Sequence, residues 1–147
     1  MFSNPSLVTR VSVGKGVGLL LGAIAFFMVP SFWPEVSSNI RWGLLFWYAT
    51  IGAFVGMAGA FTFHPILGVS LPWWFRGTIV GGWLNFVLIL FMYDKLLPVM
   101  VKTFGEGALL SSPSLIIAEG MVAGIIIDYF CTKFGGEGMR AVQADSE

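Results

Sequence analysis

The sequence predicts an all-α, polytopic integral membrane protein, with four transmembrane helices in a compact bundle joined by short loops. Of its 147 residues, 56% are hydrophobic and only 11% are charged, and the mean hydropathy is +0.84. That leaves too little polar surface to cover a soluble globule of this size. Four apolar runs each approach the ~20 residues that cross a bilayer, and glycines four residues apart recur in or beside every run. The sequence contains no alternating segments of the kind that transmembrane barrels require.

The first two spans are expected at about residues 15–33 and 42–63. Arg10 and Lys15 precede the first apolar stretch, and Pro34 closes it. A basic start followed by an apolar run also describes a signal peptide, but this run is long for one. We therefore interpret it as a span. The second run contains no charged residue.

The third and fourth spans are expected at about residues 77–97 and 113–134. Pro113 opens the fourth, as prolines often do in the first turn of a helix. Residues 135–147 are then left as a short flexible tail. The whole chain is therefore expected to be one transmembrane domain, with no room for a separate soluble catalytic domain.

Glycines four residues apart predict how the helices pack. Such residues lie nearly above one another on a helix and leave a groove into which a neighbouring backbone can settle. The four helices carry more of these grooves than packing within one chain needs. We therefore expect self-association into a homo-oligomer, or assembly with other membrane subunits. The glycines expected to pack helices are Gly14, Gly18, Gly22, Gly52, Gly56, Gly77, Gly81, Gly120 and Gly124.

Two polar residues extend the glycine stripes of the third and fourth spans. Asn85 follows Gly81 by four residues, and Asp128 follows Gly124 by four. Both side chains should therefore face protein and not lipid. We expect them to be interhelical clamps, with Asp128 meeting Arg76 or His64. The alternative is that they line a polar passage or relay protons.

Glu119 is the second carboxylate of the fourth span, about 180° around the helix from Asp128. Placing an ionisable side chain at the centre of a span costs about 2.5–3.5 kcal/mol of insertion free energy, so such a residue is expected to have a structural or functional role. Glu119 could meet another helix of the bundle, meet a neighbouring subunit, or reach outward toward Lys95 or Lys102. The alternative is that it binds a proton or a cation.

His64 is the only histidine and is expected at the end of the second span. A single imidazole without a cysteine cluster cannot build an ordinary zinc or haem site, so no metal and no cofactor are expected. The segment 65–76 that follows is apolar and aromatic. Trp73 and Trp74 favour a position in the headgroup layer, and a re-entrant segment is the alternative.

Catalysis and nucleic-acid binding are both disfavoured. Ser111, Ser112 and Ser114 have no histidine near them in sequence, and His64 is expected on the opposite face of the membrane, so no enzyme is predicted. The formal net charge is zero, which gives no basic field for a nucleic acid.

The distribution of basic residues predicts the orientation. With four crossings, both termini and the second loop share one side of the membrane. Positive residues prefer the cytoplasm, so both termini are expected there. The basic residues on that side are Arg10, Lys15, Arg76, Lys133 and Arg140.

The sequence favours an interaction module: an accessory or scaffold subunit that associates through glycine-lined helix faces in the lipid bilayer. The alternative is a small oligomeric channel or transporter for protons, cations or a small solute. Its route would be lined by Glu119, Asp128 and Asn85.

Overall fold

The computed structural model describes residues 5–64, 66, 68–143 and 145, and it confirms the all-α bundle. Four helices are long and apolar enough to cross a membrane. They are α1 (Leu7–Phe32), α2 (Ser38–Ala58), α3 (Trp73–Phe104) and α4 (Leu115–Gly135). The chain is therefore a multi-pass membrane protein.

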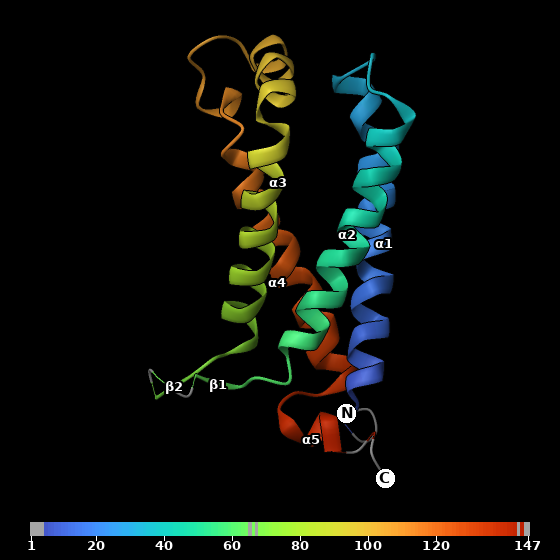
Figure 1. Cartoon of the computed structure of the whole chain (residues 1–147), viewed down its shortest axis with the longest axis vertical. Helices are drawn as coiled ribbons and strands as arrows, with labels where there is room; N and C mark the ends of the chain where they lie inside the picture. The colour runs from blue at the N-terminus through green and yellow to red at the C-terminus, as the bar shows by residue number, and fades with distance from the viewer. Residues whose placement is uncertain (1–4, 65, 67, 144, 146–147) are drawn as a thin grey trace.

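The four helices form two hairpins, α1 with α2 and α3 with α4, and α4 also packs against α1 and α2 (Figure 1). We call the end of the bundle with residues 33–37 and 105–114 the loop end. The opposite end, with the start of α1 and the α2–α3 connection, is the terminal end (Figure 1). The described ends of the chain share one side, as four crossings require. Which compartment that side faces stays a prediction.

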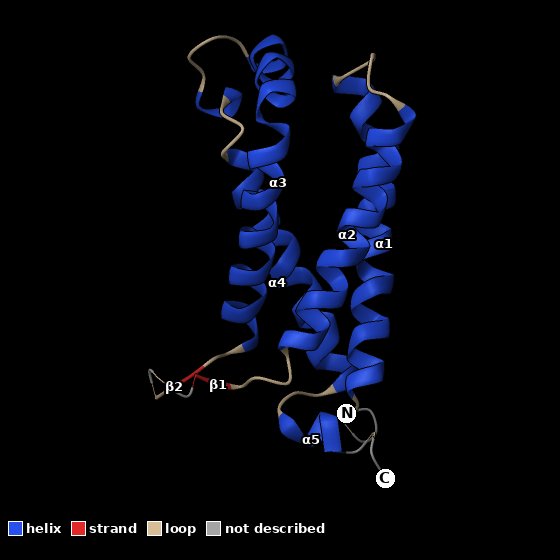
Figure 2. Cartoon of the chain, in the orientation of Figure 1, coloured by secondary structure: helices blue, strands red, loops and turns tan. Residues whose placement is uncertain are grey.

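The α2–α3 connection contains the strands of the described chain, β1 (Phe63–His64) and β2 (Val69–Ser70) (Figure 2). They are antiparallel, with Phe63 opposite Ser70 and His64 opposite Val69. His64 therefore lies on a strand beyond α2 and not at the end of a span. Residues 65 and 67 of the predicted interfacial segment lie outside the described residues.

The helix bounds differ from the predicted spans. α1 begins eight residues early because the Ser6 hydroxyl accepts a hydrogen bond from the Thr9 N–H at 3.1 Å and so caps the helix. α2 ends at Ala58, five residues before the predicted end. α3 runs from Trp73 to Phe104 and passes through Pro98, so it extends beyond the predicted 77–97 at both ends.

The glycine stripes fix the register inside each hairpin. A Cβ on Gly14 would collide with the carbonyl of Gly52, and one on Gly18 would collide with the carbonyl of Tyr48. In the second hairpin, Gly77 faces Gly124 and Gly81 faces Gly120 in the same way. All nine glycines expected to pack helices are buried within the chain itself.

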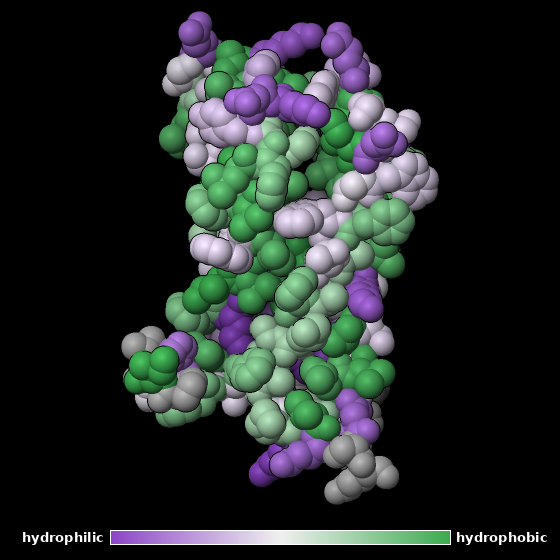
Figure 3. Space-filling model, in the orientation of Figure 1, coloured by the Kyte–Doolittle hydropathy of each residue, from purple (hydrophilic) through white to green (hydrophobic). Residues whose placement is uncertain are grey.

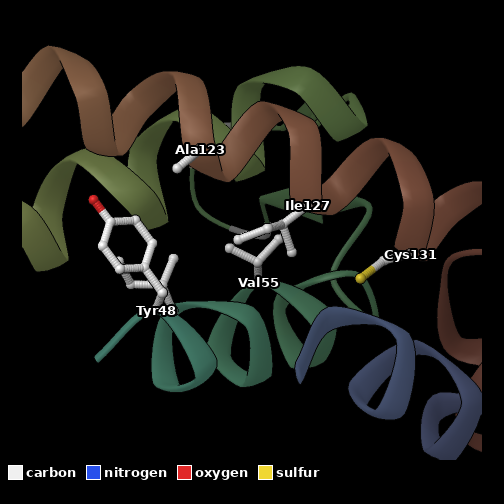
Figure 4. Packing of buried hydrophobic residues seen from close by; sticks show 6 residues of the cluster. Tyr48, Val55, Ala123, Ile127 and Cys131 are labelled. Carbon is white, nitrogen blue, oxygen red and sulfur yellow. The ribbon is translucent and has the colours of Figure 1, made fainter. Parts of the chain in front are cut away.

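A buried core joins the two hairpins. It consists of three α2 residues and three α4 residues, which Figure 4 shows facing one another. The outer surface is apolar: Phe27 is 74% exposed and Phe91 is 81% exposed. On the face drawn in Figure 3, hydrophobic residues cover most of the side of the bundle and hydrophilic residues are most numerous at its two ends, as contact with a lipid bilayer favours. The core residues are Tyr48, Ile51, Val55, Ala123, Ile127 and Cys131.

The carboxyl-terminal segment, expected to be a flexible tail, packs against the terminal end. It contains the short helix α5 (Met139–Gln143), in which Ala141 is fully buried. The Gly138 N–H donates to the Gly59 carbonyl at 2.9 Å. Asp145 accepts hydrogen bonds from the Ser6 hydroxyl at 2.7 Å and the Val8 N–H at 2.9 Å.

Substitution at Gly14 should weaken the α1–α2 hairpin far more than the same substitution at Gly16. A valine at Gly14 meets the Gly52 backbone, whereas a Cβ at Gly16 meets nothing within 4 Å. We expect Gly14→Val to lower the free energy of unfolding in mixed detergent by about 1–3 kcal/mol. Gly16→Val is the matched control. Equal losses in the two variants would contradict this packing.

Acid should release the carboxyl-terminal segment from α1. The hydrogen bonds from Ser6 and from the Val8 backbone hold the pKa of Asp145 below its usual range. The folded-state pKa is thus lower than the unfolded one, so this contribution is complete above the unfolded pKa of ~3.9 and disappears as pH falls through the folded value. The protection factors of the α5 amides, which correct for the slower intrinsic exchange at acid pH, should fall at acid pH in the wild type. Asp145→Asn should already exchange fast at neutral pH, and an unchanged rate in that variant would contradict the docking role.

Candidate functional site

A cluster of polar side chains lies at mid-height between the hairpins. Its α2 members are Trp47 and Tyr48, and Tyr48 is the central residue of Ser38–Ala58. The other members are Asn85 of α3 and Glu119 of α4. If α2 crosses the bilayer, this cluster therefore sits near the midplane.

The hydrogen bonds of the cluster converge on Asn85 and Glu119. The Tyr48 hydroxyl donates to Glu119 Oε2 at 2.6 Å, and Asn85 Nδ2 donates to the same oxygen at 2.8 Å. Asn85 Nδ2 also donates to the Ile116 carbonyl at 2.9 Å, and Asn85 Oδ1 accepts from Trp47 Nε1 at 3.1 Å. Asn85 is fully buried and joins α2, α3 and α4.

The path of the α3–α4 connection explains why Glu119 is so deep. The connection folds back beside α3 through the 3₁₀ turn Leu109–Ser111, so α4 begins well below the end of α3 (Figure 1). Ile116 is held beside Asn85, which precedes Phe104 by 19 residues (104 − 85), or ~28 Å of helix. The sequence allowed Glu119 to meet another helix of the bundle, a neighbouring subunit or a lysine. In the structure, Glu119 contacts other helices of the same bundle, α2 and α3.

A cleft opens between the hairpins from this cluster toward the loop end. Its volume is about 360 Å³, within the range of small-molecule sites. Tyr48 and Glu119 lie at its mid-height floor, and Trp33 and Leu96 lie toward the loop end. Almost all other lining side chains are apolar; they are Leu21, Ile24, Ala25, Val29, Ile40, Leu44, Leu88, Met92 and Ile116.

Glu119 is exposed and lines this cleft. Both of its hydrogen bonds are accepted by Oε2, and no described residue donates a hydrogen bond to Oε1. No lysine, arginine or histidine among the described residues forms an ion pair with it. The floor of the cleft therefore presents a carboxylate oxygen that the protein itself does not neutralise.

A second polar cluster closes the terminal end, and Arg10 is at its centre. Arg10 is fully buried, and its Nη2 donates to Asp128 Oδ1 at 2.6 Å. Its Nε donates to the Gly56 carbonyl at 3.0 Å, and its Nη1 donates to Thr132 Oγ1 at 3.2 Å and to the Gly136 carbonyl. One guanidinium thus ties α1 to α2 and α4.

Arg76 extends this cluster to α3. Its Nε lies 3.5 Å from Asp128 Oδ2, and its Nη2 donates to Glu137 Oε2 at 2.7 Å. Two arginines and two carboxylates therefore balance in charge. Asp128 is fully buried between them.

The structure brings the predicted polar residues into two separate places. Asn85 and Glu119 meet at mid-height, and Asp128 meets Arg76 at the terminal end. His64 lies on β1, beyond the end of α2. Asp128 and Glu119 are nine residues apart on α4, or ~13 Å along the helix, and they belong to different clusters.

Sequence reasoning missed Arg10 and Tyr48, although the stripes contained a signal for both. Arg10 precedes Gly14 by four residues, and Tyr48 precedes Gly52 by four. Each therefore lies on the face that packs against a neighbouring helix.

The described residues contain no group of three histidine, cysteine, aspartate or glutamate side chains that could hold a metal ion. The chain matches no protein-family model, no curated protein and no solved structure.

Removing one partner of the Arg10–Asp128 pair should destabilise the bundle strongly. Arg10→Met and Asp128→Asn should each lower the free energy of unfolding by about 3–5 kcal/mol. Asp128→Asn removes the carboxylate that Arg10 and Arg76 share, and Arg10→Met leaves Asp128 with only the more distant Arg76. The double variant should lose less than the sum. Lys15→Met, at an exposed position of the same helix, is the control and should not destabilise. Additive losses would contradict direct coupling.

Proposed function

We propose that this protein is a small membrane transporter that admits a small amphipathic solute to the cleft between its hairpins. The observation that carries the proposal is Glu119, an exposed carboxylate at the floor of an apolar cleft of about 360 Å³. Intramembrane ionisable residues that face a cavity commonly mark substrate pathways. The apolar walls would accept the body of a solute, and Glu119 with its partners would fix the polar end.

The difference between the two ends of the bundle supports transport over simple binding. The cleft extends from Glu119 to Trp33 and Leu96 near the loop end, whereas Arg10, Asp128, Arg76 and Glu137 pair with one another at the terminal end. A midplane site that is open on one side and closed on the other is the arrangement that alternating access uses. Asp128 and Arg76 therefore act as a closed gate in this proposal and do not bind solute.

The accessory-subunit function predicted from the sequence loses its main argument. That argument needed glycine faces left over for other chains, but all nine glycines lie buried inside this chain. Gly59 and Gly82 are also covered, by Arg10 and Met121 respectively. Self-association stays a prediction without a specific surface to support it.

Filling the cleft should block transport. Ile24→Trp adds bulk to a cleft wall, and Leu20→Trp makes the same change one turn earlier on α1 at a 68% exposed position outside the cleft lining. We would measure uptake of two charged probes with one apolar cage, trimethyl(1-adamantyl)ammonium and 1-adamantanecarboxylate, into proteoliposomes. Wild type and Leu20→Trp should take up at least one probe faster than protein-free liposomes, and Ile24→Trp should not.

Two results would overturn transport through the cleft. One is uptake of both probes at the protein-free rate by wild-type protein. The other is equal uptake by Ile24→Trp and Leu20→Trp when both elute as folded protein on gel filtration.

A further inference from the structure

We propose that the solute is an amine: an apolar body with one protonated nitrogen, which donates an N–H hydrogen bond to Oε1 of Glu119. This inference rests on the proposed transport function and names the chemical class that the cleft would select. It follows from the charge of the floor, the free oxygen and the composition of the walls.

The charge of the floor favours a cation. Tyr48 and Asn85 both donate to Glu119 Oε2, but neither carries a positive charge. No described basic side chain lies within 4.0 Å of the carboxylate. This contrasts with Asp128, which is flanked by two arginines on the same helix bundle. A cationic solute would supply the positive charge that no described side chain provides at Glu119.

The hydrogen-bonding pattern favours a nitrogen that carries a proton. Oε2 already accepts two hydrogen bonds, at 2.6 and 2.8 Å, whereas no described residue donates to Oε1. A protonated amine can donate to a carboxylate oxygen in a short, charge-assisted bond. A quaternary ammonium has the charge but no N–H, so it should bind more weakly than a protonated amine of the same shape.

The walls favour an apolar body over a hydrated ion. Leu21, Leu44, Leu88 and Met92 line the cleft and offer no oxygen ligands. Ca²⁺ and Mg²⁺ are held by about six oxygens, from protein or water, and the floor offers a single carboxylate among apolar neighbours. Burial of apolar surface, at roughly 25 cal/mol per Å², would instead reward an alkyl or cage-like group attached to the nitrogen.

Binding of matched probes to wild-type protein in nanodiscs tests this class, with empty nanodiscs as the blank. The probes share an adamantane cage: 1-adamantanamine, trimethyl(1-adamantyl)ammonium, 1-adamantanol and 1-adamantanecarboxylate. At pH 7 the amine is protonated, as alkylamines are. We expect the amine to bind about tenfold or more tightly than the alcohol, the quaternary ion to be intermediate, and the carboxylate to be weakest.

Variants then assign the preference to Glu119. Glu119→Gln should lower the affinity for the amine to that for the alcohol, with the affinity for the alcohol unchanged, because glutamine can keep a bond from Tyr48 but carries no charge. Glu119→Asp should retain part of the preference. Glu106→Gln, at an exposed loop position, is the matched control and should behave as wild type.

The possible failures are distinguishable. Equal affinity of wild type for amine, alcohol and carboxylate, with all three blocked by Ile24→Trp, would overturn the amine assignment and leave transport through the cleft standing. A preference for the amine that survives in Glu119→Gln would overturn the role of Glu119. Absence of binding by any probe, with no uptake of either charged probe, would overturn both proposals.

Discussion

Close contact between helix backbones is the constraint on which this structure depends. In lipid, an apolar side chain gains little free energy by moving from contact with lipid tails to contact with another helix. Helices therefore associate through close packing and hydrogen bonds. Here the backbones approach where side chains are absent, with Gly14 against Gly52 and Gly77 against Gly124. Any larger residue at these contacts would separate the helices.

The glycine contacts also decide which polar groups meet. In an antiparallel pair, a step toward the end of one helix is a step toward the start of its partner. With Gly81 beside Gly120, the next stripe position on α3 is Asn85, and it lies beside the start of α4 at Ile116. With Gly77 beside Gly124, Asp128 is carried the other way, to the terminal end and its arginines. The register of α3 against α4 therefore places Glu119 among uncharged partners in one cluster and Asp128 beside two arginines in the other.

The two clusters have opposite physical characters. Asp128 is enclosed and neutralised by Arg10 and Arg76, and it closes the bundle. Glu119 is held in position by uncharged donors and remains open to an apolar cleft. A charge kept at mid-membrane without a counterion is expensive, and this is why we assign solute recognition to Glu119 and a structural closure to Asp128.

The amino-acid sequence alone was enough to specify the number of membrane-spanning helices, their approximate places and the small-residue faces through which they pack. These properties follow from hydropathy and from the four-residue step of a helix, both of which are local. It also determined that Asn85 and Asp128 face protein, because each continues a glycine stripe. Arg10 and Tyr48 could have been found by the same rule, applied in the other direction along the chain.

The partner of each polar residue, by contrast, is set by how the helices pack in three dimensions. The depth of Glu119 depends on a connection that folds back beside α3, and helical periodicity contains no information about that path. The cleft depends on how two hairpins diverge beyond their shared core, and the closure at the terminal end joins Arg10 to Asp128 across 118 positions of sequence. Contacts between segments so far apart are set by how whole helices pack, and no local pattern of residues specifies them.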